Sequence, residues 1–306
     1  LKMNPMDYRT AAEFFPAFSP QDQVLAFSIL GGIPHYLAQF DDHLSVADNI
    51  KRHALAKGCA LYSEVEFLLH QELRETSVYN GIIQAVALGA SSLGEIASRA
   101  MVDAQKAAVY LRNLIELGII EREFSVEASI KEQSKGARGL YRMADEFFRF
   151  WYAFVFPNRS DLEMLDVDGV YRFDVEPQLT RFASASFEDI CRTWLREQNR
   201  AGELPTRFGE IGRFWSKQLE IDAVGLSKAH GNRPKGALKL FGECKFGHEL
   251  VGENVLAHLD DKIAQIAPDG ARERYLFARE GFTEGLEQRA REDGSLHLVS
   301  VDELYH

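Results

Sequence analysis

Two short stretches carry the residues with the most distinctive chemistry in this chain: "LEIDAVG" at 219–225 and "LFGECKF" at 240–246. The first places Glu220 and Asp222 among aliphatic residues, and the second places Glu243 and Lys245 in a similar setting. Charged side chains are costly in the middle of buried strands unless they have partners. Their positions therefore predict that these four residues are one another's partners in a single site.

Strand geometry predicts how these side chains meet. Side chains alternate between the two faces of a strand, so Glu220 and Asp222 share a face, as do Glu243 and Lys245. If the two strands form a hairpin through residues 227–237, Asp222 and Glu243 converge at one end of the sheet. Two neighbouring carboxylates repel each other unless a cation lies between them. Because Mg²⁺ and Mn²⁺ prefer oxygen ligands, the pattern predicts a site for one of these ions.

A metal ion at this position would support phosphodiester hydrolysis. It would lower the pKa of a bound water molecule and stabilise the charge that develops on a phosphate group. Lys245 would orient or deprotonate that water, or neutralise the phosphate, so the predicted catalytic residues are Asp222, Glu243 and Lys245. The alternative is a Glu–Lys ion pair on an exposed sheet face, but the flanking Val, Ile, Leu and Phe residues favour the metal site. Glu220 is either an outer ligand or a partner of Lys217 or Lys245.

The elements expected to position these residues alternate between helix and strand from residue 159 onward. Their order predicts a mixed sheet that is covered by helices on both faces. Helices are expected at 184–204, 252–266 and 283–293. Strands are expected at 207–215, 218–226, 238–246, 274–280 and 296–304.

Two other segments precede this α/β part. Residues 7–75 have helical apolar periodicity, broken at Gly31–Pro34, and predict a helical segment. In 78–158, Ser92 and Asp103 are expected to cap the second and third of three helices, and two strands follow, as in a winged helix-turn-helix. The third helix is not basic, whereas Arg138 lies in the basic loop that follows. The module is therefore either a DNA contact or a protein-packing spacer.

Composition is that of a globular protein, with 46% hydrophobic and 26% charged residues. No apolar run reaches the about 18–20 residues that span a bilayer, so no membrane contact is expected. Cys59, Cys191 and Cys244 lack metal-binding spacing, which favours a reduced, cytoplasmic setting and no structural zinc. The net charge of −11 argues against coating nucleic acid or membrane with the whole surface.

Local charge points to a different partner. Residues 181–250 contain twelve Lys or Arg and nine Asp or Glu, a small positive excess within an acidic chain. Lys228, Arg233, Lys235 and Lys239 lie in and beside the hairpin between the two predicted site strands. Basic side chains bind phosphates and release counterions, so these residues are the expected DNA contacts. The alternative is an ordinary solvated loop.

The site residues also carry a family resemblance. Asp222, followed by Glu243-Cys244-Lys245 on the next strand and preceded by a helix with Glu188, resembles the PD-(D/E)xK, or restriction-endonuclease-like, core. This resemblance implies a metal-dependent deoxyribonuclease in which Asp222, Glu243 and Glu188 hold the metal and Lys245 assists the nucleophilic water.

Three positions that the resemblance singles out, Glu188, Lys262 and Gln265, also have plainer explanations. Glu188, which lies next to Asp189, would equally be a solvated helix carboxylate. Lys262 and Gln265 occupy the helix after the second site strand, where nucleases of this class often place a polar helper. A solvated helix face is the favoured explanation for both.

A wider resemblance covers nearly all of the 306 residues. "LGGIPHYL" at 30–37, "YRMADEFFRFWYAFVFPNR" at 141–159 and the two site stretches occur in the same order in archaeal-type AAA+ ATPases. This resemblance implies a multidomain α/β chain, with a helical ATPase-lid-like segment at 1–76, a winged helix at 77–158 and a nuclease-like domain of unknown function at 159–306. The chain contains no Walker A or Walker B motif, so it resembles that family from the lid onward. ATP is expected only if an upstream ATPase domain is present.

Three functional hypotheses follow. The first is a metal-dependent nuclease or DNA-processing protein that uses Mg²⁺ or Mn²⁺. The second is a non-catalytic DNA-binding or assembly module that is coupled to an upstream ATPase or to a second copy of the chain. The third is a protein-interaction adaptor that does not bind DNA.

Overall fold

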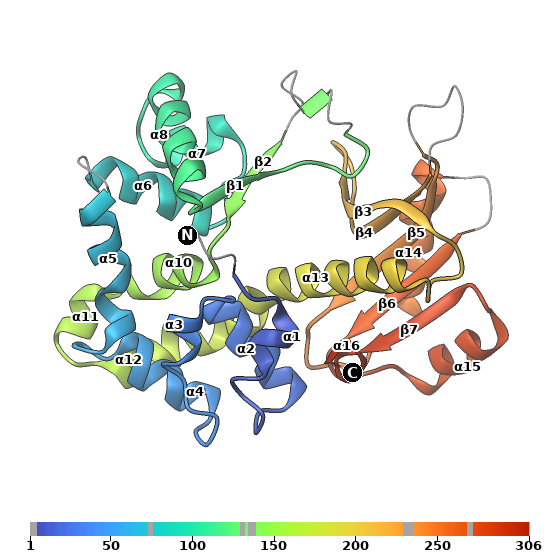
Figure 1. The fold of residues 1–306 in the computed structure, drawn as a ribbon, viewed down its shortest axis with the longest axis horizontal. Coiled ribbons are helices and arrows are strands. Elements are labelled where there is room, and N and C mark those ends of the chain that lie inside the picture. The colour runs from blue at the N-terminus through green and yellow to red at the C-terminus, as the bar shows by residue number, and fades with distance from the viewer. Residues whose placement is uncertain are drawn as a thin grey trace. The chain divides into compact units, whose positions relative to one another are not determined.

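The computed structural model describes residues 5–72, 76–128, 132–133, 139–228, 236–267 and 272–305. The fold is mixed α/β, with a two-stranded and a five-stranded sheet (Figure 1). The chain forms two compact units: unit 1 contains 1–123 and 139–180, and unit 2 contains 124–138 and 181–306. The division at 76 and 158 stays a prediction. No described helix has both the length and the apolar character needed to cross a membrane.

Unit 1 is mainly helical, as expected from its periodicity. The predicted break is present, because α2 ends at Leu30, Gly31 has a φ of 62°, and α3 begins at Pro34. The helices before the first strand are α1 (Tyr8–Ala12), α2 (Pro20–Leu30), α3 (Pro34–Leu37), α4 (Val46–Asn49), η1 (Ile50–Leu55), α5 (Ala60–Glu72), α6 (Thr76–Ala87), α7 (Leu93–Arg99) and α8 (Ala104–Leu117). The later helices are α10 (Glu146–Phe150), η2 (Trp151–Val155), α11 (Arg159–Glu163), α12 (Val167–Val170), η3 (Tyr171–Val175) and the start of α13 (Glu176–Ala201).

The aromatic stretch 147–156 supplies much of the buried core of unit 1. It spans α10 and η2, and most of its large side chains are buried. The polar atoms of two of these side chains have partners: Trp151 Nε1 donates to the Tyr62 carbonyl at 2.9 Å, and Tyr152 Oη donates to Asn80 Oδ1 at 2.6 Å. Burial of the aromatic rings stabilises this core, and the hydrogen bonds avoid the cost of leaving its few polar atoms without partners.

The segment with three helices and two strands also has the predicted order. Ser92 caps α7, where its Oγ accepts from the Glu95 amide at 3.3 Å, and Asp103 caps α8, where its Oδ1 accepts from the Lys106 amide at 2.8 Å. β1 (Ile120–Glu123) pairs antiparallel with β2 (Leu140–Met143). The capping residues in the sequence therefore mark these helix starts correctly.

Unit 2 contains a five-stranded mixed sheet. Its strands are β3 (Phe208–Trp215), β4 (Glu220–Ser227), β5 (Leu238–Lys245), β6 (Glu273–Ala278) and β7 (Leu296–Ser300). They lie in chain order, antiparallel from β3 to β5 and parallel from β5 to β7 (Figure 1). Three further helices, α14 (Glu253–Ile266), α15 (Glu284–Glu292) and α16 (Val301–Tyr305), belong to this unit. The predicted mixed sheet is therefore confirmed.

Helices cover both faces of this sheet. α14 and α15 make the two crossovers between the parallel strands, and Leu259 and Leu286 join one buried core with Phe241 of β5. α13 contacts the residues that point the other way, since the Trp194 ring lies 5.9 Å from that of Phe277 on β6. A strand flanked on both sides by helices has little solvent access, so any charge on it needs a partner.

The last predicted strand extends too far at its C-terminal end. Residues 296–304 were expected to be extended, but β7 ends at Ser300 and Val301–Tyr305 form α16. Ser300 and Glu303 make a capping box: the Glu303 amide donates to Ser300 Oγ at 3.4 Å, and the Ser300 amide donates to Glu303 Oε2 at 2.7 Å. The Ser-x-x-Glu spacing thus overrides the apolar alternation at this point.

One stability prediction arises from Asp145, the N-cap of α10, whose Oδ1 accepts from the Phe148 amide at 3.0 Å. Burial raises the pKa of this carboxyl to about 6. The folded chain holds this proton more tightly than the unfolded chain. The contribution of Asp145 to the free energy of unfolding is therefore fully present below about pH 4 and is lost as the pH rises through 6. Asp145→Asn keeps the capping oxygen and should reduce this loss by about 2 kcal/mol.

Urea unfolding at pH 4.5 and pH 7.5 checks this prediction. The control is Asp103→Asn at the exposed cap of α8, which should leave the pH dependence as it is in the wild type. An Asp145→Asn variant with the wild-type pH dependence would contradict the assignment.

Candidate functional site

The structure brings Asp222 and Glu243 together on neighbouring strands. β4 and β5 pair antiparallel with Ala223 opposite Gly242, so Asp222 and Glu243 are neighbours at the next position. The Cys244 amide donates to Asp222 Oδ2 at 2.8 Å. The two carboxylates that the hairpin was expected to bring together therefore lie side by side.

Two ammonium groups compensate the charge of Glu243. Its Oε1 accepts from Lys245 Nζ at 2.8 Å and its Oε2 from Lys262 Nζ at 2.9 Å, while the residue is only 5% exposed. Burial alone would raise the pKa of Glu243, but the two lysines hold it below its usual value. Burial would lower the pKa of Lys245, but its bond to Glu243 raises it. Both groups are therefore charged at neutral pH, Glu243 as a carboxylate and Lys245 as an ammonium group.

Lys262 is the helper that the sequence did not favour. It lies on α14, its side chain is 16% exposed, and it contacts Glu243 instead of facing solvent. Its neighbours in the helix include the buried Leu259 and Ile263, so the apolar stripe of α14 turns this lysine toward the sheet. Gln265, in contrast, is exposed and donates only to the Asp261 carbonyl, so the solvated interpretation is correct for that residue.

Glu188 on α13 faces the charge of Asp222. Burial, followed by the negative charge of Asp222, raises the pKa of Glu188 to about 7. Burial, followed by the charge of Glu243, raises the pKa of Asp222 to about 6. Glu188 is therefore not an ordinary solvated carboxylate, because its titration depends on the same group of charges as the two strand residues.

Arg192 fixes α13 to β4 and was missed in the sequence. The residue is 2% exposed, and its Nη1 donates to the Asp222 carbonyl at 2.7 Å while its Nη2 donates to Asp189 Oδ1 at 2.5 Å. The same Nη1 lies 3.6 Å from Glu188 Oε2. The available signal was the spacing of Glu188, Asp189 and Arg192, which places two carboxylates three and four residues before an arginine on one helix face.

Two buried thiols lie beneath this group. Alternation along β5 turns Cys244 away from Glu243 and Lys245, and its thiol interacts with that of Cys191 on α13. Both are free cysteines, and burial raises the pKa of each. Protonated, buried thiols are poor nucleophiles and poor metal ligands, so this pair supports the site by packing.

The residues present fit a hard divalent cation in donor type. Asp222 Oδ1 accepts no hydrogen bond from the described part of the chain. Burial and neighbouring negative charge raise the pKa values of Asp222 and Glu188, although Arg192 lies 3.6 Å from Glu188. Carboxylate oxygens are the ligands that Mg²⁺ and Mn²⁺ prefer. Glu243 fits less directly, since both its oxygens already bind lysines. Moreover, the oxygens of the three carboxylates do not all lie within 4.8 Å of one another.

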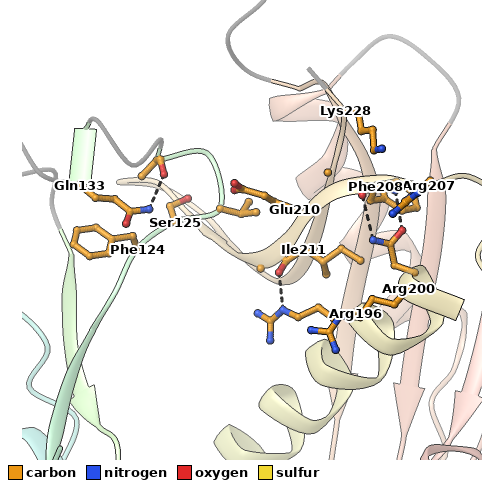
Figure 2. A pocket seen from close by; sticks show the side chains of 15 residues that line it. Phe124, Ser125, Gln133, Arg196, Arg200, Arg207, Phe208, Glu210, Ile211 and Lys228 are labelled. Atoms are coloured by element: carbon orange, nitrogen blue, oxygen red, sulfur yellow. Dashed lines mark hydrogen bonds between the residues drawn. The ribbon is translucent and has the colours of Figure 1, made fainter. Parts of the chain in front are cut away.

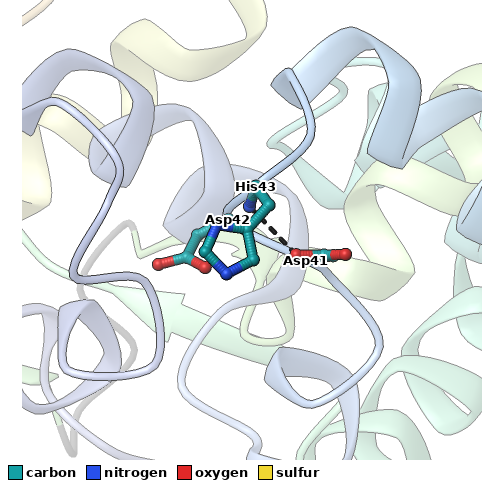
Figure 3. Close-up of side chains that lie close together, drawn as sticks. All are labelled: Asp41, Asp42 and His43. Carbon is teal, nitrogen blue, oxygen red and sulfur yellow. Dashed lines mark hydrogen bonds between the residues drawn. The ribbon is translucent and has the colours of Figure 1, made fainter.

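Among the described residues, the compact group of potential metal ligands is elsewhere, in the loop of Asp41, Asp42 and His43 (Figure 3). Both of its carboxylates accept backbone hydrogen bonds. The His43 amide donates to Asp41 Oδ1 at 2.9 Å, and the Ala17 amide donates to Asp42 Oδ2 at 2.8 Å. The first hydrogen bond lies within a short surface turn and the second joins this turn to Ala17, so both acidic side chains already have partners in the chain.

Of the predicted DNA contacts, the structure describes Lys228 and Lys239. Lys228 is exposed at the end of β4, and Lys239 is partly exposed on β5. Arg138, Arg233 and Lys235 lie outside the described residues.

Glu220 has a partner that was not anticipated. It is exposed and forms an ion pair with Arg213 of β3, not with Lys217 or Lys245. Its carboxylate therefore stabilises the pairing of β3 and β4 at the surface and adds no ligand to the group around Asp222.

Comparison with known proteins finds relatives whose function is not described. Residues 151–255 match the DUF234 family, described as "Archaea bacterial proteins of unknown function", and this range contains Glu188, Asp222, Glu243 and Lys245 but not Lys262. An uncharacterised protein of Methanocaldococcus jannaschii, MJECL04, is 30% identical over 228 residues, which is 74% of this chain and 50% of that protein. The chain therefore spans about half the length of this relative.

Similarity to solved structures is weak. The protein VC1899 from Vibrio cholerae shares 13% identity over 96% of this chain and 58% of its own, with a TM-score of 0.31. Human N-acetylserotonin methyltransferase shares 10% identity over 80% of this chain and 66% of its own, with a TM-score of 0.19. Scores of this size do not establish a shared fold.

Arg192 leads to a stability prediction. Arg192→Ala would remove one donor to Asp189 and the donor to the Asp222 carbonyl, and losing a buried arginine with such partners costs about 3 kcal/mol. Urea unfolding should show this loss, whereas Arg289→Ala on the exposed surface of α15 should stay within about 0.5 kcal/mol of the wild type. Equal stability of the two variants would show that Arg192 does not join α13 to β4.

Proposed function

We propose that unit 2 carries a metal-dependent phosphodiester-hydrolysing site of the PD-(D/E)xK type. The observation that supports this most strongly is the neighbouring pair Asp222 and Glu243, with Lys245 on Glu243 and the charge of Asp222 acting on Glu188. Structural ion pairs balance their charges, whereas this group keeps two buried carboxylates, Asp222 and Glu188, with raised pKa values. Perturbed titration of this kind is typical of functional sites.

In this proposed site, each residue would have a separate role in hydrolysis. Asp222, Glu188 and Glu243 would hold Mg²⁺ or Mn²⁺, which supplies a Lewis acid and an activated water. The Lys245 side chain is 43% exposed and Lys262 only 16%, so Lys245 is the one able to turn toward a substrate phosphate. Lys262 would then remain on Glu243 and keep its carboxylate oriented. Lys245 would stabilise negative charge on the phosphate as an ammonium group.

DNA is the substrate class that the surrounding charge favours. Lys228 and Lys239 flank the hairpin that carries Asp222 and Glu243, and the predicted contacts Arg138, Arg233 and Lys235 belong to the same proposal. The order of α6, α7, α8, β1 and β2 is that of a winged helix-turn-helix, a module that many DNA-binding proteins use. The chain would then be the part of an archaeal-type ATPase-like protein that follows its nucleotide-binding core, with the lid-like segment at 1–76.

One observation favours a second function. Both oxygens of Glu243 already bind an ammonium group, so its charge is neutralised without a metal. A non-catalytic DNA-binding or assembly module, coupled to an upstream ATPase, would need nothing more at this position. That module would bind DNA with strong salt dependence and would hold no metal at Asp222 and Glu243.

A cleavage assay tests the proposed activity. The purified chain should cut DNA with Mg²⁺ or Mn²⁺, and Asp222→Asn and Lys245→Ala should each lose at least about 100-fold in rate, because one removes a charged ligand and the other a charge-stabilising group. Asp261→Asn and Lys217→Ala make the same chemical changes at exposed positions of unit 2 and should retain the wild-type rate.

Two results would contradict the proposal. Cleavage that survives both site substitutions would place the activity elsewhere. No cleavage with either metal, together with salt-dependent DNA binding, would favour the non-catalytic module.

A further inference from the structure

A second concave surface of unit 2 does not include the carboxylate group. It is a cavity of about 550 Å³ between the last turns of α13, the first half of β3 and the segment that begins at Phe124 (Figure 2). None of Glu188, Asp222, Glu243 and Lys245 lines it. The volume is in the range of pockets that hold small organic ligands.

The lining of this cavity is strongly basic. It includes Arg196, Arg200, Arg207 and Lys228, against a single acidic residue, Glu210. Of the four cations, Arg196 is held by a hydrogen bond within the chain, since its Nε donates to the Ile211 carbonyl at 3.0 Å. The other three are exposed, and they form no ion pair with any part of the chain that the structure describes. In a chain of net charge −11, three such cations around one hollow favour an anion there.

The wall of the cavity is rigid. Asn199 of α13 makes two hydrogen bonds with the backbone of Phe208: its Nδ2 donates to the carbonyl at 3.1 Å, and its Oδ1 accepts from the amide at 2.8 Å. These bonds, with that of Arg196, hold the end of α13 against β3. A preformed wall lowers the ordering cost of binding, because only the exposed side chains remain to be fixed.

The cavity also offers an aromatic surface. Phe124 is partly exposed and lines it, as Figure 2 shows, on the side formed by the segment 124–128. The Val126 amide donates to the Arg213 carbonyl at 2.9 Å, which places this segment along the outer edge of β3. The Phe124 ring lies across the cavity from Arg207 and Lys228 (Figure 2). This arrangement suits a single strand that crosses the cavity, with a base stacked on the ring and the phosphates of neighbouring nucleotides on the cations.

We propose that this cavity, which we call the basic pocket, binds a single-stranded segment of nucleic acid, with phosphates on Arg200, Arg207 and Lys228 and a base against Phe124. A cavity of about 550 Å³ is too small for a duplex and suits a short stretch of a single strand. The three cations are solvent-exposed, which suits a backbone that passes through and continues beyond the pocket. The proposal gives the DNA partner of the proposed function a second contact, but it does not require that the carboxylate site cleave.

Fluorescence anisotropy with a labelled dodecathymidylate tests the basic pocket. The assay contains EDTA, so binding is measured without metal or cleavage. The combined variant Arg200→Ala, Arg207→Ala, Lys228→Ala should bind at least about 10-fold more weakly, and its slope of log affinity against log salt should become smaller by about 2, because each lost phosphate contact removes about 0.7.

The matched control removes three exposed cations of unit 2 that do not line the pocket: Arg181→Ala, Lys217→Ala, Arg289→Ala. The variant Phe124→Leu separately tests stacking and should weaken binding several-fold without changing the salt slope. Equal losses in the two triple variants would overturn the proposal, because the effect would then be general electrostatic attraction.

Competition with free thymidine monophosphate distinguishes the two sources of a nucleotide phosphate. A strand site predicts that millimolar mononucleotide displaces the oligonucleotide only weakly. A pocket that binds the mononucleotide tightly, with no loss of oligonucleotide binding in the Arg200, Arg207, Lys228 variant, would overturn the strand as occupant. Anisotropy in EDTA reports the basic pocket, whereas the metal-dependent cleavage assay reports Asp222 and Lys245, so failure of the pocket and failure of the proposed cleavage site give different results.

Discussion

The repulsion between Asp222 and Glu243 is the interaction on which the rest of the site depends. Antiparallel pairing of β4 and β5 forces two carboxylates into neighbouring positions of a sheet that has helices on both faces. The structure compensates them unequally, since Glu243 has two ammonium partners and Asp222 accepts one backbone amide. The excess negative charge is therefore on the side of Asp222, where the charge of Glu188 adds to it. Such an imbalance is costly for folding and favourable for binding a cation.

The helices on the two faces of the sheet each bring one cation to this charge. α13 supplies Arg192, which holds the carbonyl of Asp222, and α14 supplies Lys262, which holds Glu243. Each cation is anchored by neighbours whose apolar side chains pack on the sheet. The position of the carboxylates therefore depends on the packing of both helices, although neither helix carries the Asp and ExK residues themselves. The exposed Lys245 remains as the side chain that is able to leave its partner.

Prediction from sequence succeeded where the signal was local. Alternation along two strands and a short hairpin placed Asp222 beside Glu243, and capping residues marked the starts of α7 and α8. Prediction was incomplete where packing decides. Lys262 turns toward the sheet only because the apolar stripe of α14 does, and Arg192 finds the Asp222 carbonyl only once α13 is docked. The basic pocket was not visible because Arg200, Arg207 and Lys228 come from different elements, and only Lys228 stood in a basic stretch.

Calorimetric titration of the metal-free chain with Mn²⁺ tests the central claim, that the uncompensated charge of Asp222 and Glu188 is a cation site. One ion should bind per chain, at least about 10-fold more weakly after Asp222→Asn and unchanged after Asp261→Asn. The affinity should fall as the pH is lowered from 8 to 6, because protons compete for carboxyls whose pKa values are raised to about 6 and about 7. The absence of Mn²⁺ binding at pH 8, or equal binding by the wild type and Asp222→Asn, would contradict the account.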